Sequence, residues 1–224
     1  MVRNSPREVI ARELDVDPPA DLDLRPRWNL CPGEEVLAVV EGRQGRRIGA
    51  LRWGLVPSFA PDASGGARAI NARAETIAVR PAFRDPFRRR RCLVVADAFY
   101  EWRREDGRRV PYCFRPAGGG LLTFAGVWDR WRDDSGGSLT TCAIVTCPAN
   151  ALVGAVHDRM PAVLAGADRA RWLDVTRQDP DTLQALLVPA PPEALEGFEV
   201  APLVNSPRHD SPECVRPVGG RLLP

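Results

Sequence analysis

Short apolar runs separated by turn residues recur along the chain, and they restrict its fold more than any other feature. The run Cys92–Ala96 has five apolar residues, the length of a buried strand and too short for a stable helix. Comparable runs lie at 35–40, 48–55, 110–115, 121–128, 140–146 and 198–204. Many short strands with few helices predict an α+β fold. We expect a single domain over residues 1–224, with a curved antiparallel β-sheet or open barrel flanked by short helices.

The clearest helix signal begins at Ser5. Ser5 is the expected N-cap, Pro6 the first helical residue, and Glu8 the partner of Ser5 in a capping box. Further short helices are expected near 79–87, 148–156, 167–174 and 179–187. Gly42–Arg46 and the arginine-rich segment Arg103–Arg109 are each expected to form a hairpin turn. Pro61–Ala67 is rich in glycine, serine and proline, which predicts a flexible surface loop.

The composition is that of an ordinary soluble globular protein, with 44% apolar and 27% charged residues. There is no apolar run of about eighteen residues and no signal-peptide core near the start, so we expect a cytoplasmic protein without membrane contact. The six cysteines include no Cys-x-x-Cys pair, and there are only two histidines. We therefore expect no metal site and no structural disulfide. No glycine-rich phosphate loop is present either, and no cofactor is expected.

All 31 basic residues are arginine, although the net charge is only +2. A GC-rich genome explains this usage without reference to function. Arginine nevertheless has a planar fork that matches phosphate and stacks on bases, so any phosphate groove here must be lined by arginine. The run Arg88–Arg91 precedes the central strand. Two interpretations stay open: a solvated approach to the strand, or a contact to phosphate.

The segment Asp97–Trp102 follows the central strand and holds one carboxylate, Glu101, between two aromatic residues. A carboxylate surrounded by aromatic rings loses hydration, and its pKa rises toward neutrality. Such a group can act as a general acid or base at pH 7. The alternative is a surface glutamate at an exposed strand end, with Phe99 and Trp102 in the core.

Two other segments are equally dense in polar residues, Asn71–Thr76 and His157–Pro161. Together with further motifs in order along the chain, they resemble the SOS response-associated peptidase (SRAP) family, whose members attach covalently to abasic sites in single-stranded DNA. The further motifs are Trp28–Gly33, Trp53–Pro57, Phe99–Trp102, Val204–Asn205 and Ser211–Cys214. Each motif is weak alone, but their joint occurrence is specific. The resemblance covers nearly the whole chain.

The resemblance implies roles for individual residues. Asn71 corresponds to the family asparagine that positions the reacting N-terminus and sugar. Glu101 corresponds to the acid/base that assists ring opening and imine chemistry. His157 corresponds to the histidine that exchanges a proton with the sugar oxygen, and a structural loop histidine is the alternative. DNA contacts are implied for three residues: Arg73, Trp53 and Arg159. Glu75 is expected to be structural.

The expected partner is single-stranded DNA that contains abasic sites, bound by a monomer that associates with the nucleoid. Aromatic platforms and backbone arginines suit unpaired bases without sequence readout. Candidate aromatic neighbours are Trp53, Phe59, Tyr100 and Trp102. The loop Pro61–Ala67 is a candidate for closing over the strand.

The start of the chain departs from the family pattern. Family members begin Met-Cys-Gly-Arg followed by an aromatic residue. The amine of that cysteine forms an imine with the abasic aldehyde, and its thiol closes a thiazolidine. This chain begins Met1-Val2-Arg3-Asn4-Ser5. A truncated chain, a misassigned start codon and a natural variant without the nucleophile are three explanations, and we favour the first two. Cys31 and Cys92 are expected in the core.

We therefore expect DNA binding, a reversible imine through the Met1 or Val2 amine and weak strand cleavage, but no durable crosslink. As enzymes, family members act as abasic-site lyases and as peptidases that remove their own initiator methionine. Two rival functions stay open. One is a peptidase that uses Glu101 and His157, although no nucleophile–His–acid order is evident. The other is a non-catalytic binding module for single-stranded or damaged DNA.

Overall fold

The central strand β4 (Arg91–Ala96) is buried at every residue, as its apolar sequence predicts. The computed structural model describes residues 1–42 and 45–223. In it, β4 lies between β1 (Glu35–Gly42) and β7 (Leu122–Arg132), and both neighbours run antiparallel to it. An apolar strand with neighbours on both sides satisfies its backbone groups by hydrogen bonding and its side chains by burial. β4 is therefore the centre of the larger sheet.

The larger sheet has seven strands and curls into a barrel. Its order is β2 (Gly45–Trp53), β1, β4, β7, β8 (Ser138–Pro148) and β3 (Asn71–Arg73), and β9 (Arg159–Pro161) also pairs with β8. A further pairing of β2 with β8 closes the ring β2-β1-β4-β7-β8, and this pairing is parallel. Five strands of alternating direction cannot close without one parallel pair. The barrel prediction is confirmed, and the sheet is mixed rather than wholly antiparallel.

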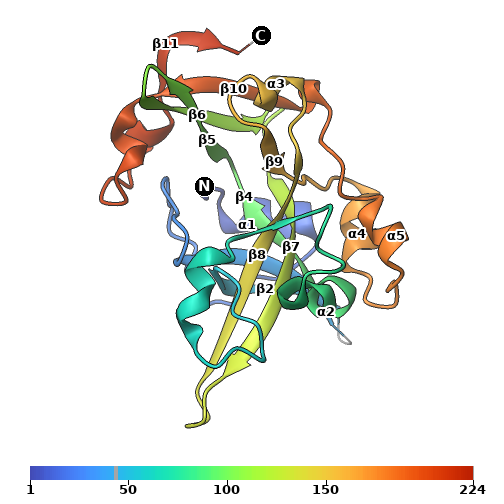
Figure 1. Ribbon diagram of the computed structural model, residues 1–224. Coiled ribbons are helices and arrows are strands. Elements are labelled where there is room, and N and C mark those ends of the chain that lie inside the picture. Colours follow the sequence, from blue (N-terminus) through green and yellow to red (C-terminus); the bar gives the residue numbers. More distant parts are fainter. Residues whose placement is uncertain (43–44, 224) are drawn as a thin grey trace.

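A second sheet of four antiparallel strands stands beside the barrel. Its order is β11 (Pro217–Leu222), β10 (Leu195–Val200), β6 (Arg108–Pro116) and β5 (Phe99–Glu105). Only Asp97 and Ala98 separate β4 of the barrel from β5 of this sheet. Val2 forms a bridge with Ala98, so the start of the chain lies between the two sheets (Figure 1). The small apolar cluster formed around Val2, Ala98 and Tyr100 joins the second sheet to this segment.

Short helices cover the sheets. They are α1 (Arg7–Leu14), α2 (Pro81–Arg89), α3 (Ala151–Gly154), α4 (Ala167–Leu173) and α5 (Pro180–Gln184), with 3-10 turns η1 (Ala63–Arg68), η2 (Pro192–Ala194), η3 (Pro202–Asn205) and η4 (Pro212–Val215). Trp172 and Leu173 of α4 are buried as predicted. Asp179 caps α5 by accepting from the backbone N–H of Thr182. Within the described residues, no helix has both the length and the apolar character to cross a membrane.

The capping-box prediction for α1 is wrong. The helix begins at Arg7, its N-cap is Pro6, and no side chain caps it. The hydroxyl of Ser5 bonds instead to the carboxylate of Asp97, which also accepts from the backbone N–H groups of Asn4 and Ser5. A carboxylate that accepts three donors outcompetes a local cap, and it ties the first residues to the link between the sheets.

Other boundaries also differ from the sequence predictions. The arginine-rich segment 103–109 is mostly strand, because β5 and β6 continue to a tight turn at Asp106–Gly107, both in left-handed conformations. The last predicted strand, 198–204, is shifted to β10, and β11 was not predicted. Part of the segment 61–67, expected to be a loop, forms η1. β1 and β2 pair antiparallel as expected, but the tip of their hairpin, 43–44, lies outside the described residues.

The arginine run before β4 divides into three environments. Arg88 and Arg89 are exposed, while the guanidinium of Arg90 lies 3.2 Å from Asp129. Arg91 is 1% exposed and donates to five backbone carbonyls, those of Phe87, Arg88, Trp172, Asp174 and Arg177. Burial lowers the pKa of Arg91 to about 10. Arg91 is therefore neither a solvated residue nor a phosphate contact, because it joins α2 to α4 and the loop beyond.

Candidate functional site

A cavity of about 610 Å³ lies where the barrel meets the second sheet. Its wall combines segments far apart in the sequence: Met1, 29–32, Trp53, Ile70, Asn71, 99–102, Arg109, Ile144, Thr146, His157, Pro161, Val204, Asn205 and Pro207. The three polar segments of the sequence analysis each contribute at least one residue. Such a volume accommodates a ligand of the size of one nucleotide.

Glu101 extends into this cavity from β5, and its side chain is 23% exposed. The pKa of this carboxyl is raised from 4.5 to about 7, mainly by burial and in smaller part by nearby Asp158. His157 and Arg109 oppose the rise without cancelling it. Glu101 is therefore close to half-protonated at neutral pH, the condition under which one group can both donate and accept a proton. The prediction of a raised pKa is confirmed, but burial in the cavity causes it rather than aromatic neighbours alone.

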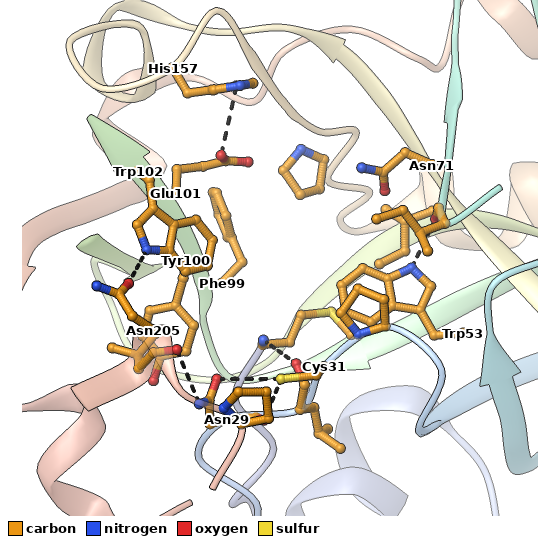
Figure 2. A pocket seen from close by; sticks show the side chains of 18 of the residues that line it. Asn29, Cys31, Trp53, Asn71, Phe99, Tyr100, Glu101, Trp102, His157 and Asn205 are labelled. Atoms are coloured by element: carbon orange, nitrogen blue, oxygen red, sulfur yellow. Dashed lines mark hydrogen bonds and ion pairs between the residues drawn. The ribbon is translucent and has the colours of Figure 1, made fainter. Parts of the chain in front are cut away.

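His157 lies beside Glu101 in the cavity wall (Figure 2). Its Nδ1 lies 3.7 Å from Oε2 of Glu101 and 3.1 Å from both the backbone nitrogen and the backbone oxygen of Arg159. Nδ1 can accept from the Arg159 N–H when it is unprotonated and donate to the Arg159 carbonyl when it is protonated. The backbone thus accommodates both protonation states, as proton exchange requires.

Asn71 lies on the barrel side of the cavity, across from Glu101 (Figure 2). It is the first residue of β3, which pairs with β8 in parallel, so the strand directs its exposed amide toward the space that Glu101 and His157 enclose. Trp53 supports this wall from below, and its indole N–H donates to the carbonyl of Ile70 at 2.8 Å. The structure thus brings together Asn71, Glu101, His157 and Trp53 of the predicted site.

The two predicted DNA-binding arginines do not line the cavity. Arg73 is exposed two residues after Asn71, on the same side of β3. Arg159 instead forms a bidentate pair with Glu75, at 2.6 and 3.0 Å, and donates to the carbonyl of Thr146. Arg159 therefore holds β9, and with it His157, against the barrel, which also gives Glu75 a structural role.

The floor of the cavity is held by the C-terminal part of the chain. The side-chain amide of Asn29 donates to three backbone carbonyls, those of Val204, Ser206 and His209. The carboxylate of Asp210 accepts from the backbone N–H groups of Trp28 and Asn29. The hydroxyl of Tyr100 donates to the carbonyl of Trp28 at 2.7 Å. These bonds tie the segment 204–210 to the cavity wall, so the wall is built from both ends of the chain.

Cys31 is not the core residue that the sequence predicted, whereas Cys92 is fully buried. Cys31 is half-buried and lines the cavity, and burial raises the pKa of its thiol. Beside it, the amine of Met1 donates to the carbonyl of Leu30 at 2.9 Å (Figure 2). Burial lowers the pKa of this amine to about 6, so it is largely unprotonated at neutral pH.

Sequence reasoning missed Arg109 and assigned no role to Asn205. Both line the cavity and both fix Trp102: Oδ1 of Asn205 accepts from the indole N–H at 2.6 Å, and the Arg109 guanidinium lies 5.1 Å from the indole centroid. Asn205 was visible only as part of a motif. Arg109 gave no signal, because the segment around it was expected to be a turn. Phe59, one of the aromatic candidates, is 69% exposed and does not line the cavity.

The cavity gathers several groups that can exchange protons. Across residues 1–42 and 45–223, no three His, Cys, Asp or Glu side chains come together in a way that could hold a metal ion. The cavity instead holds a carboxyl with a pKa near neutrality, an imidazole, a carboxamide and an amine. This set can protonate a leaving oxygen, accept a proton and attack a carbonyl carbon.

Comparisons with known proteins agree with this arrangement. The family model "SOS response associated peptidase (SRAP)" matches residues 1–207. Abasic site processing protein YoqW of Bacillus subtilis (strain 168) is 39% identical over 194 residues, covering 86% of this chain and 87% of its own. Abasic site processing protein HMCES of Gallus gallus is 34% identical over 192 residues, covering 75% of this chain and 56% of its own.

Solved structures show the same fold. A protein from Bacteroides thetaiotaomicron matches with a TM-score of 0.75 at 25% identity, over 83% of this chain and 82% of its own. A phage-related protein from Bordetella bronchiseptica matches with a TM-score of 0.69 at 28% identity, over 89% of this chain and 92% of its own. The motifs, the cavity and these likenesses lead to one conclusion: the chain belongs to the SOS response associated peptidase (SRAP) family.

Proposed function

We propose that the cavity binds an abasic nucleotide of single-stranded DNA and forms an imine with its aldehyde. The observation that carries this proposal is the pair formed by Glu101 and His157, 3.7 Å apart in the cavity, with the pKa of Glu101 raised to about 7. The names of the relatives YoqW and HMCES, both called abasic site processing proteins, support the choice of substrate.

The steps follow from the groups in the cavity. The closed sugar of an abasic nucleotide must open to expose its aldehyde, which requires a proton for the ring oxygen and a base for the C1′ hydroxyl. His157 supplies the first and Glu101 accepts the second, and the carboxamide of Asn71 orients the sugar by hydrogen bonding. The Met1 nitrogen then attacks the aldehyde carbon. One amine proton passes to the former aldehyde oxygen as the C–N bond forms. Glu101 then returns its proton to that oxygen, which leaves as water, and the nitrogen keeps its second proton in a protonated C=N group.

The imine also makes strand cleavage possible. The C=N group acidifies the C2′ hydrogen, and its removal by His157 or Glu101 expels the 3′ phosphate, which is the lyase reaction. An imine that gains no second bond at its carbon hydrolyses when water returns. The proposed activity therefore combines DNA binding, a reversible covalent step and slow cleavage, carried out by a monomer at exposed single strands.

The test uses a single-stranded oligonucleotide with one abasic site and intact-mass spectrometry. We expect an adduct in the presence of cyanoborohydride, which reduces imines, and no stable adduct without it. Glu101→Gln should slow trapping by about 100-fold, because general acid–base catalysis contributes about 10²–10⁴-fold. Glu105→Gln, a matched change farther along β5 at a carboxylate bonded to Arg103, should leave the rate unchanged.

Three outcomes separate this function from its rivals. Binding without any reductive trapping would contradict the covalent step and leave a binding module. Cleavage of peptides that is lost in Glu101→Gln would favour a peptidase. An oligonucleotide in which tetrahydrofuran replaces the abasic sugar has no aldehyde, so it should bind without being trapped, and trapping of that analogue would contradict the proposed chemistry.

A further inference from the structure

One face of the β5–β6 hairpin carries two arginines beside Trp102. In the register of this antiparallel pair, Trp102 is opposite Pro111 and Arg104 is opposite Arg109. Opposite residues of an antiparallel pair share a face, and side chains alternate along each strand, so Trp102, Arg104 and Arg109 lie on one face. Arg104 and Arg109 are both exposed.

The opposite face of the hairpin, by contrast, carries a carboxylate beside its arginines. There, Arg103 forms an ion pair with Glu105, and Arg108 lies opposite the same residue in the strand register. Among the residues that the structure describes, no carboxylate lies within 4.0 Å of the guanidinium of Arg104 or Arg109. Like charges directly opposite each other in a sheet repel and reduce its stability. An anion bound between the two would relieve that repulsion.

The arginine pair is continuous with the cavity. Arg109 lines the cavity and its guanidinium stacks on Trp102, while the bond from Trp102 to Asn205 fixes the indole. One guanidinium of the pair is thereby held in place at the mouth of the site before any ligand arrives. A planar, ordered guanidinium matches the two oxygens of a phosphate better than a mobile ammonium does.

We propose that Arg104 and Arg109 form a phosphate subsite, which binds the backbone of the nucleic-acid strand on one side of the nucleotide in the cavity. This inference rests on the proposed function, because it assumes that the cavity holds a nucleotide of a longer strand. The two arginines contact phosphate rather than base edges, so their contribution is independent of sequence. The subsite guides the strand from the cavity along the face of the hairpin.

The test measures the dissociation constant of a single-stranded oligonucleotide that contains the tetrahydrofuran analogue, over a series of salt concentrations. The double variant Arg104→Gln/Arg109→Gln should bind about tenfold more weakly at low salt. The slope of log K against log salt should become less steep by about 0.7 for each phosphate that the variant no longer neutralises. The control Arg130→Gln/Arg132→Gln removes the same charge from exposed positions near the far end of β7, distant from β5 and β6 (Figure 1). It should keep the wild-type slope.

A second arm tests the direction of the strand. Two oligonucleotides place the analogue at the 5′ end or at the 3′ end, so that the strand leaves the cavity on one side only. The double variant should weaken the binding of one of them and not of the other. Equal slopes for the double variant and wild type, or equal losses for both oligonucleotides, would overturn the subsite while leaving the proposed function intact. Absence of binding by the wild-type protein would instead overturn the proposed function itself.

Discussion

The burial of Glu101 leads to a quantitative prediction about stability. The pKa of this carboxyl rises from 4.5 to about 7 on folding, mainly because burial disfavours the charged form. At about 1.4 kcal/mol for each pKa unit, the ionised carboxylate costs the folded state about 3 kcal/mol above pH 7. The folded state binds the proton more tightly, so the stabilisation from protonation is fully present below pH 4.5 and is lost as pH rises through 7.

Glu101→Gln removes this ionisation while preserving the shape of the side chain. The free energy of unfolding of the variant should exceed that of wild type by up to about 3 kcal/mol at pH 8.5, and the excess should shrink toward zero near pH 5. Urea denaturation at four pH values between 5 and 8.5 measures the difference directly. The other titrating groups contribute equally to the free energy of unfolding of both proteins, so their contributions cancel in the difference.

The matched control is Glu105→Gln, at a carboxylate that is 43% exposed. Its difference from wild type should stay within about 0.5 kcal/mol across the same range. A pH-independent difference between Glu101→Gln and wild type would refute the reasoning, because it would mean that Glu101 is ionised equally easily in the folded and unfolded chain.

Four further changes test the scaffold of the protein. Arg91→Met should lower the free energy of unfolding by about 3 kcal/mol or more in urea titration, because five buried or partly buried carbonyls lose their donor. Gly54→Ala should destabilise by more than about 1 kcal/mol, since Gly54 has φ +132° and a Cβ would lie 2.7 Å from a carbonyl of η1. Gly65→Ala meets nothing within 4 Å and should change the thermal midpoint little. Asn29→Ala should cost about 2 kcal/mol and speed proteolysis of 204–209.

The sequence was sufficient to predict the barrel but not its closure. Continuous apolar runs such as Cys92–Ala96 identify buried strands, and the short β1–β2 hairpin predicts an antiparallel pair. The parallel pairing of β2 with β8 joins residues about ninety positions apart, and no local pattern signals it. Capping at Ser5 failed for a similar reason, since the competing acceptor, Asp97, comes from a distant segment. A tertiary contact overrides a local sequence preference wherever the tertiary contact is the stronger interaction.

The motifs predicted which residues meet at one cavity, but not the contacts that hold those residues in place. Asn71, Glu101 and His157 meet at one cavity as the family resemblance implied. Arg159 pairs with Glu75 instead of lining that cavity. Glu75 lies just after β3, Arg159 begins β9, and both strands pair with β8. The sequence did not indicate that Arg109 belongs to the site. Its stacking on Trp102 depends on the register of β5 with β6, which the structure shows.

The central claim is that Glu101 exchanges protons in the reaction, and one measurement tests it most directly. The rate of imine trapping by cyanoborohydride, under single-turnover conditions with abasic single-stranded DNA, would be recorded from pH 5.5 to 8.5 for wild type and for Glu101→Gln. We predict a transition near pH 7 in wild type, matching the raised pKa of Glu101, and its disappearance in the variant, with any transition from the Met1 amine near pH 6 retained in both. Identical pH profiles and rates for the two proteins would contradict the claim.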